Sequence, residues 1–174
     1  MSSFAIALRV SNQFGVLTRV SGMFSRRGFN IDSLTVSNTE DPRVSRMTLV
    51  CQGDETVKKQ IIKQLSKIHD VLEIQEMTPD ICVSRELLLI KVAINGNTRQ
   101  QIMDAANVFR GKIIDYSPHS FCIEMTGETS KVDAYVELMK PFGIMEMCRT
   151  GIVALERGES CLKTYAYHTG EEIA

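Results

Sequence analysis

One order of strands and helices occurs twice in this chain, and that repetition constrains the fold more than any single motif does. The segment "FAIALRV" has the alternating pattern of a strand, and the residues from Val16 to Gly28 have the apolar stripe and closing glycine of a helix. Two β-rich runs, "IDSLTVS" and "VSRMTLVC", flank the turn signal Asp41-Pro42. A second helix over Val57–Leu65 and the strand "DVLEIQEM" complete the order βαββαβ.

The same order returns about 82 residues later without obvious sequence identity. "ELLLIKVAI" has strand periodicity, and "NTRQQIMDAANVF" has that of a helix with Asn97 or Thr98 at its start. "KIIDYS" and "SFCIEM" predict a hairpin, "TSKVDAYVELM" predicts a helix that ends before Pro141, and "GIMEMCRTGIVAL" predicts one closing strand. A period the size of a domain indicates two copies of one architecture.

Each βαββαβ unit predicts a four-stranded antiparallel sheet with both helices on one face, because such crossovers are right-handed. The predicted fold class is α+β, built from two tandem ferredoxin-like sandwiches. Residues 1–78 and 86–158 form the two predicted domains, residues 79–85 the linker, and residues 159–174 a C-terminal tail of no assigned role. One sheet face in each domain has no helix, so we expect self-association to cover that face or to extend the edge strands.

Composition and charge exclude several functional classes. Apolar residues make up 44% and charged residues 24% of the 174 residues, which is typical of a soluble globular protein, and we expect a cytoplasmic one without a membrane span. Lys and Arg minus Asp and Glu gives 10 − 9 for residues 1–80 and 10 − 12 for residues 81–174, so neither half has the basic surface of a nucleic-acid binder. The five cysteines and three histidines are too dispersed for a disulfide framework or a metal site.

Catalytic motifs are also missing from the sequence. The third strand, "VSRMTLVC", has no aromatic residue on which an RNA base could stack, and the loop "SNQFGVL" has no arginine for a phosphatase cradle. No glycine-rich phosphate loop, His-Glu-x-x-His or Gly-x-Ser-x-Gly motif occurs. We therefore expect no catalytic residue in this chain, although an enzyme with a spatially assembled site is a distant alternative.

The loop "NQFG" between the first strand and the first helix has the pattern of a binding site. The first N–H groups of a helix are without partners, and they attract a carboxylate. Gly15 allows close approach, while Asn12 and Asn30 offer amides for an ammonium or carboxylate group. These residues can equally form a turn and a helix cap. The residues by themselves leave both interpretations open.

A longer string resembles a known family. The stretch "NQFGVLTRVSGMFSRRGFNIDSLTV", followed by "DPRVSRMT", is similar to the regulatory small subunit of acetohydroxyacid synthase, also called acetolactate synthase. "FRGKIIDYSP" and "RTGIVALERG" extend the resemblance into the second half, so that it covers roughly residues 4–158. The departures from the family pattern are Gln13, Phe14 and the tail.

The resemblance implies an N-terminal ACT domain that binds a branched-chain amino acid, usually valine, and a C-terminal ferredoxin-like domain. It implies a homodimer with effector sites between two ACT domains, associated with a separate catalytic large subunit. That subunit holds thiamine diphosphate, magnesium and FAD and condenses pyruvate with pyruvate or 2-oxobutyrate in valine, leucine and isoleucine biosynthesis. The small subunit raises its activity and confers feedback inhibition.

Carried over position by position, the resemblance implies effector-site residues that hold the polar head groups, the carboxylate or the side chain of the amino acid: Asn12, Gly15, Val16, Leu17, Asn30 and Ile31. The exposed segment "NTEDPRVSR" is the expected contact with the large subunit. The alternative is a stand-alone amino-acid-binding ACT protein that regulates another target. Phe14, which is larger than the family's usual residue, leaves the preferred effector open.

Overall fold

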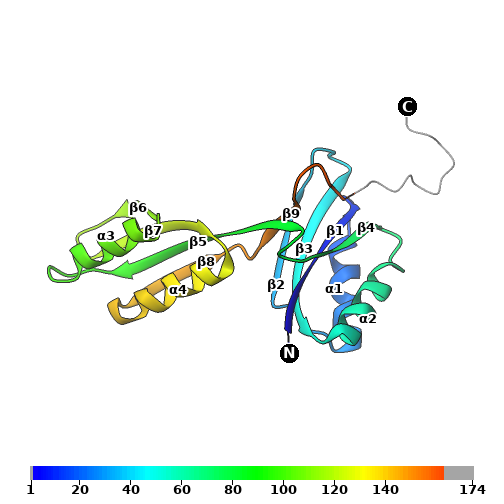
Figure 1. Cartoon of the computed structure of the whole chain (residues 1–174), viewed down its shortest axis with the longest axis horizontal. Helices are drawn as coiled ribbons and strands as arrows, with labels where there is room; N and C mark the ends of the chain where they lie inside the picture. Colours follow the sequence, from blue (N-terminus) through cyan, green and yellow to red (C-terminus); the bar gives the residue numbers. More distant parts are fainter. Residues whose placement is uncertain (1, 163–174) are drawn as a thin grey trace. The chain divides into compact units, whose positions relative to one another are not determined.

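The computed structural model describes residues 2–162. They form two compact units, one of residues 2–83 with 154–162 and one of residues 84–153 (Figure 1). The first elements in chain order are β1 (Ser2–Ser11), α1 (Val16–Arg27), β2 (Ser33–Asn38), β3 (Val44–Gly53), α2 (Glu55–Leu65) and β4 (Val71–Met77). The elements that follow are β5 (Cys82–Ala93), α3 (Arg99–Val108), β6 (Lys112–Tyr116), β7 (Ser120–Gly127), α4 (Thr129–Met139), the short η1 (Lys140–Phe142), β8 (Ile144–Arg149) and β9 (Val153–Glu156).

The first sheet is antiparallel with the strand order β2-β3-β1-β4, and α1 and α2 cover one of its faces (Figure 1). In its register, Leu8 of β1 lies opposite Met47 of β3 and Ile74 of β4. The alternate residues of β1 point to the helices and form the core together with apolar residues of β3, α1 and α2, namely Ile6, Leu8, Val10, Val20, Phe24, Met47, Leu49, Ile61 and Leu65. The first predicted sandwich is confirmed.

The two helices of this unit begin in different ways. The side chain of Asp54 accepts a hydrogen bond of 2.8 Å from the Val57 N–H and so caps α2. No side chain caps α1, which starts after Gly15 and ends at Gly28, and both glycines have the left-handed backbone conformation. The start of α1 is therefore left open.

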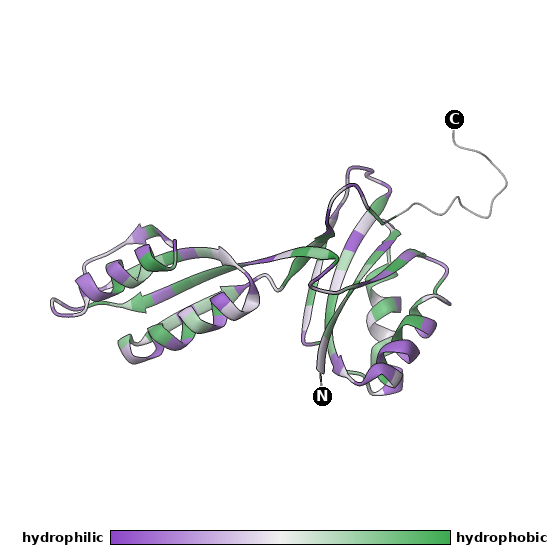
Figure 2. Cartoon of the chain, in the orientation of Figure 1, coloured by the Kyte–Doolittle hydropathy of each residue, from purple (hydrophilic) through white to green (hydrophobic). Residues whose placement is uncertain are grey.

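The second sheet has the order β6-β7-β5-β8, with β9 paired to β5 off this path. Both α3 and α4 pack on one face of it, because apolar residues of both helices belong to one core with those of β5 and β7, namely Leu88, Ile90, Val92, Ile102, Ala106, Phe121, Ile123, Met125, Val132, Tyr135 and Met139. Figure 2 shows hydrophobic and hydrophilic residues alternating along the helices and strands of each unit. The second predicted sandwich is confirmed as well.

The end of the second repeat differs from the prediction. One closing strand was expected over "GIMEMCRTGIVAL", but β8 ends at Arg149 and β9 begins at Val153. Gly151 has a φ of 75°, a left-handed conformation that an extended strand does not contain. Thr150 is bonded through its N–H to the Leu87 carbonyl oxygen at 3.0 Å, which fixes the chain where the strand is interrupted.

The chain's own C-terminal segment packs on the face of the first sheet that has no helix. Nη2 of Arg46 donates to the carbonyl oxygen of Ala154 at 2.8 Å, and Nη1 of Arg9 donates to that of Leu162 at 3.4 Å. Two sheet residues on this face, Ala7 and Thr48, are buried. The sequence assigned residues 86–158 to the second domain, whereas the second compact unit ends at Val153 and residues 154–162 group with the first. The rest of the predicted tail, residues 163–174, lies outside the described residues.

Tyr135 in α4 is fully buried, and its hydroxyl oxygen has no hydrogen-bond partner among the described residues. The centroid of its ring lies 5.2 Å from that of the Phe109 ring, and burial raises the pKa of the phenol to about 12. A buried hydroxyl without a partner costs about 1–3 kcal/mol. We therefore expect Tyr135→Phe to increase the free energy of unfolding by about 1 kcal/mol, measured by urea titration.

The matched control for this substitution is Tyr116→Phe, which removes the hydroxyl of a residue that is 59% exposed. It should change the free energy of unfolding by less than about 0.5 kcal/mol. A Tyr135→Phe protein that is less stable than the wild type would show that the hydroxyl is satisfied, for example by an internal water molecule.

Candidate functional site

The loop between β1 and α1 is held by the loop between β2 and β3. The N–H of Asn12 donates to the carbonyl oxygen of Arg43 at 2.7 Å, and Nδ2 of Asn12 donates to that of Pro42 at 2.8 Å. Asn12 thus lies where the sequence placed it, at the end of the first strand. Its Nδ2 is already used within the chain, while no hydrogen bond among the described residues uses its Oδ1, which is able to accept from an ammonium group.

Gly15 gives the start of α1 its shape. Its φ of 81° is in the left-handed region, where a β-carbon is disfavoured, and a β-carbon added there would lie 3.1 Å from Nη1 of Arg19. The first turn has no acidic residue, and the Val16 N–H has only a long contact of 3.5 Å to the Gln13 carbonyl oxygen. The positive end of the helix dipole therefore faces the loop without a side-chain cap, as an anion site requires.

Arg19, one turn into α1, adds a positive charge beside this helix start. Its Nε donates to Oδ2 of Asp70 at 2.6 Å, and its Nη2 lies 3.5 Å from the carbonyl oxygen of Phe14. The Arg19 side chain is about half exposed, at 49%, so an anion in the loop can reach it. Asp70 also accepts through its backbone oxygen from the Ser11 N–H at 2.8 Å. Sequence reasoning missed the Arg19–Asp70 pair, because 51 residues separate the two side chains in the chain.

The apolar site residues divide into two groups. Val16 is buried in the core, so only its backbone N–H is available to a ligand. Leu17 is 45% exposed and Phe14 is fully exposed, and both can contact a bound side chain. Ile31 is partly buried against the core. The Val16 side chain fills the space between α1 and the sheet, so its predicted part in the effector site falls to its backbone N–H.

Asn30 lies at the opposite end of α1 from Gly15. The helix of twelve residues between them is about 18 Å long at 1.5 Å per residue. Gly28 ends α1, and Nδ2 of Asn30 donates to Oδ1 of Asp32 at 2.8 Å. One chain consequently does not bring Asn12 and Asn30 together around a single amino acid.

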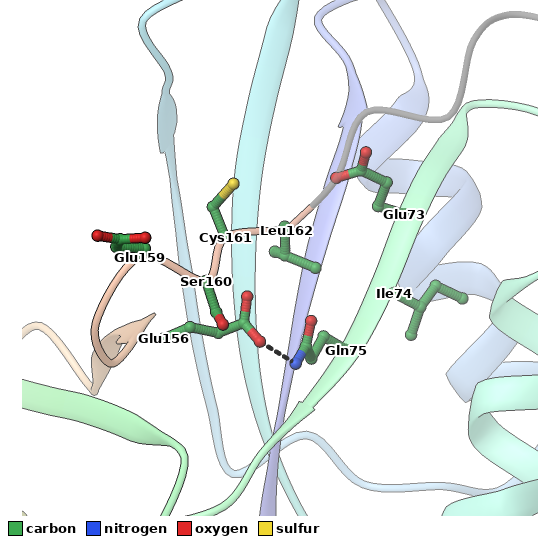
Figure 3. Close-up of a pocket in the computed structure, with 8 residues that line it drawn as sticks. All are labelled: Glu73, Ile74, Gln75, Glu156, Glu159, Ser160, Cys161 and Leu162. Atoms are coloured by element: carbon green, nitrogen blue, oxygen red, sulfur yellow. Dashed lines mark hydrogen bonds between the residues drawn. The ribbon is translucent and has the colours of Figure 1, made fainter.

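A cavity of about 500 Å³ lies elsewhere in the first unit, between β4 and the C-terminal segment (Figure 3). Nε2 of Gln75 donates to Oε1 of Glu156 at 2.5 Å across it, and Glu73 and Leu162 are buried at its edge. None of the predicted effector residues lines this cavity. It is separate from the loop before α1.

Comparison with known proteins supports the sequence resemblance. A family model described as the AHAS small subunit-like ACT domain matches residues 6–73, and one described as the small subunit of acetolactate synthase matches residues 85–158. A probable acetolactate synthase small subunit from Archaeoglobus fulgidus is 49% identical over 153 residues, which is 88% of this chain and 96% of that protein. The chain belongs to the acetolactate synthase small-subunit family.

Other members of the acetolactate synthase small-subunit family are similarly close. The acetolactate synthase small subunit of Mycobacterium leprae is 42% identical over 158 residues, covering 91% of this chain and 94% of that one. The crystal structure of the acetolactate synthase small subunit from Thermotoga maritima matches with a TM-score of 0.85 at 38% identity, covering 92% of this chain and all of that one. The first unit is thus an ACT-like domain, and the resemblance read from the sequence is confirmed.

Within residues 2–162, no group of three or more His, Cys, Asp or Glu side chains is placed to hold a metal ion. No helix in the same range is long and apolar enough to cross a membrane.

Proposed function

We propose that this chain is the regulatory subunit of an acetolactate synthase in branched-chain amino acid biosynthesis. It binds a branched-chain amino acid, with valine as the first candidate, at the loop before α1. It raises the activity of a separate catalytic subunit in the cytoplasm and confers feedback inhibition on it. Family membership supports the regulatory role, and the open start of α1 beside Arg19 is the observation that supports the effector site.

The roles of the loop residues follow from their chemistry. The effector's carboxylate accepts from the backbone N–H groups at Gly15–Leu17, and the Arg19 guanidinium adds an attractive charge. The amide oxygen of Asn12 accepts from the ammonium group. Exposed Leu17 and Phe14 contact the aliphatic side chain.

The distance between the ends of α1 supports a site made by two copies of the chain. Asn12 and Gly15 lie at one end of the helix and Asn30 and Ile31 at the other, about 18 Å away. A two-fold axis that places two ACT domains side by side with their α1 helices antiparallel brings the loop of one copy to Asn30 of the other. Such a homodimer has two identical effector sites, and neither site is complete in a single chain.

The loop between β1 and α1, here called the effector loop, is hydrogen-bonded to the segment that we expect to contact the catalytic subunit. Asn12 is bonded to Pro42 and Arg43 in the loop between β2 and β3. That loop is itself ordered by Arg43, whose side chain and backbone N–H bond Asp41 and lower the pKa of its carboxyl to about 2. A small change at Asn12 on effector binding is therefore transmitted to residues 38–43. A coupling free energy of about 1–3 kcal/mol between the effector loop and this segment corresponds to a change in effector affinity of several-fold to about a hundredfold between the two conformations of the segment.

The chemistry of acetolactate formation belongs to the partner in this proposal. Thiamine diphosphate, magnesium and FAD bind the catalytic subunit, and this chain contributes no catalytic residue. The first unit is the effector-binding domain.

Two measurements test the proposal. Calorimetric titration of the full chain with valine, leucine, isoleucine and serine should show binding of at least one branched-chain amino acid and none of serine. Acetolactate formation by the catalytic subunit should rise when this chain is added and fall again when the bound amino acid is added. Binding without any effect on acetolactate formation would favour the stand-alone regulator, and acetolactate formation by this chain alone would overturn the assignment.

A further inference from the structure

The second unit has a basic cavity that the proposed effector site does not use. It has a volume of about 500 Å³ and lies at the end of β7 and the start of α4. Its lining includes four cationic and two anionic side chains, a formal charge of 4 − 2 = +2 in a chain of net charge −1. The lining residues are Arg85, Arg110, Lys112, Glu124, Thr126, Gly127, Glu128 and Lys131.

Arg110 reaches this cavity through an unusual backbone conformation. Its φ of 57° makes it the one non-glycine residue with a left-handed backbone among residues 2–162. The conformation follows the end of α3, where the Arg110 N–H donates to the Asn107 carbonyl oxygen at 3.0 Å and the Gly111 N–H donates to that of Ala106 at 2.7 Å. Glycine is the residue that such a position ordinarily favours. An arginine held there at a cost in strain indicates that its side chain has a use.

The two carboxylates do not neutralise the cavity. Oε1 of Glu128 lies 3.7 Å from Nη1 of Arg85, and Glu124 of β7 lies opposite Lys112 of β6 in the strand register. Arg110 and Lys131 have no ion pair within the described part of the chain. The Lys131 ammonium donates to the carbonyl oxygen of Thr126 at 3.4 Å. Two positive charges therefore face the cavity without an anionic partner.

The start of α4 adds to the positive potential of the cavity. Glu128 is the N-cap residue of α4, but its side chain makes no capping hydrogen bond. Gly127 leaves the Lys131 stem against the backbone, because a β-carbon at that glycine would lie 2.8 Å from Cδ of Lys131. Backbone N–H groups at a helix start and arginine and lysine side chains are the groups that bind phosphate oxygens in proteins.

We propose that this cavity, where Arg110 and Lys112 meet the start of α4, binds a small molecule that carries a phosphate or diphosphate group. No aromatic or large apolar side chain lines the cavity, so the phosphate group rather than a hydrophobic ring is what it recognises. The volume suits a compact ligand, and a charge of +2 is too small for a nucleic acid. Arg110 and Lys131 bind the phosphate oxygens, and Arg85 exchanges its contact with Glu128 for the ligand.

Calorimetric titration of the full chain at low ionic strength tests this site, with inorganic phosphate, pyrophosphate and citrate as probes. Pyrophosphate should bind more tightly than phosphate and more tightly than citrate. Arg110→Gly removes the guanidinium while suiting the left-handed backbone, so the variant should fold and its affinity for pyrophosphate should fall at least about tenfold. Lys112→Gln should weaken binding in the same direction, whereas Glu128→Gln should strengthen it.

Lys140→Gln is the matched control, because it makes the same change in charge at the other end of α4, where Lys140 pairs with Glu137. It should leave pyrophosphate affinity within about twofold of the wild type, since screening weakens charges beyond about 10 Å. The site is refuted if pyrophosphate does not bind at millimolar concentration, if Lys140→Gln weakens it as much as Arg110→Gly, or if citrate binds equally tightly. The titration is independent of the amino-acid site, because valine binding should be unchanged in Arg110→Gly.

Discussion

Mixing Asn12→Ala chains with Asn30→Ala chains should restore about one quarter of the wild-type effector sites, although each variant alone loses them. The reason is the position of the two amides at opposite ends of α1. If each site takes its loop from one copy and Asn30 from the other, both sites are damaged in either homodimer. In a mixed dimer, one site receives both substitutions and the other receives neither. Random exchange makes about half of the dimers mixed, and each of these has one intact site.

The measurement is valine titration by calorimetry of each variant and of the mixture after exchange of subunits. Each variant alone should bind valine at least about tenfold more weakly than the wild type, because a hydrogen bond to a charged group is lost. The mixture should recover sites with wild-type affinity at about a quarter of the wild-type number. A matched control is a mixture of Asn12→Ala with Gly15→Asn. Every site in this mixture contains a damaged loop, so no sites should be recovered.

A mixture of Asn12→Ala and Asn30→Ala that recovers no sites would contradict the two-copy arrangement. Retention of wild-type affinity by Asn30→Ala alone would instead remove Asn30 from the site and leave the loop at Gly15 as a complete site within one chain. The two outcomes are distinguishable because the first leaves both variants defective and the second leaves only one defective.

The periodicity of the sequence was sufficient to predict the helices and the sheets. In α1, Val16, Val20, Met23 and Phe24 are the buried residues, and the glycine after Arg27 ends the helix where the pattern of apolar residues stops. The interruption at Gly151 was not predictable, because a glycine in a strand pattern fits an extended strand and a left-handed break equally well. The packing of residues 154–162 on the first sheet was also missed, because Ala154 and Leu162, the two buried residues of that segment, are too far apart in sequence to form a strand or helix pattern.

The sequence predicts which residues belong to the candidate site but not how far apart the fold places them. Asn12 and Gly15 are only three residues apart in the chain, so one strand-to-helix loop holds both of them whatever the rest of the fold does. Asn30 is separated from them by a whole helix, and the length of that helix places it at the far end. Arg19 and Asp70 form an ion pair across 51 residues of sequence, which no local pattern encodes. Local motifs thus predict parts of a site, and the fold decides which parts meet.

Replacing Arg149 by methionine should lower the free energy of unfolding by about 3 kcal/mol. Nε of Arg149 donates to Oε1 of Glu86, and Nη1 donates to Oδ1 of Asp133 at 2.7 Å, so this side chain joins β8 to β5 and α4. Glu86 is only 3% exposed, and its other oxygen accepts from the Thr129 hydroxyl at 3.2 Å. Without the guanidinium, a buried carboxylate remains with one neutral hydrogen bond and no opposite charge. That uncompensated burial is what makes the expected loss large.

Urea unfolding of a second variant separates this explanation from simple loss of packing. Glu86→Gln in the Arg149→Met background removes the buried charge and should recover more than about 1 kcal/mol of the loss, because a neutral amide costs less to bury than a carboxylate. Lys140→Met, which breaks an exposed ion pair of 2.5 Å with Glu137, should cost less than about 0.5 kcal/mol. Equal losses for Arg149→Met and Lys140→Met would refute this explanation, because burial of the carboxylate would then have no effect on the cost of removing its cationic partner.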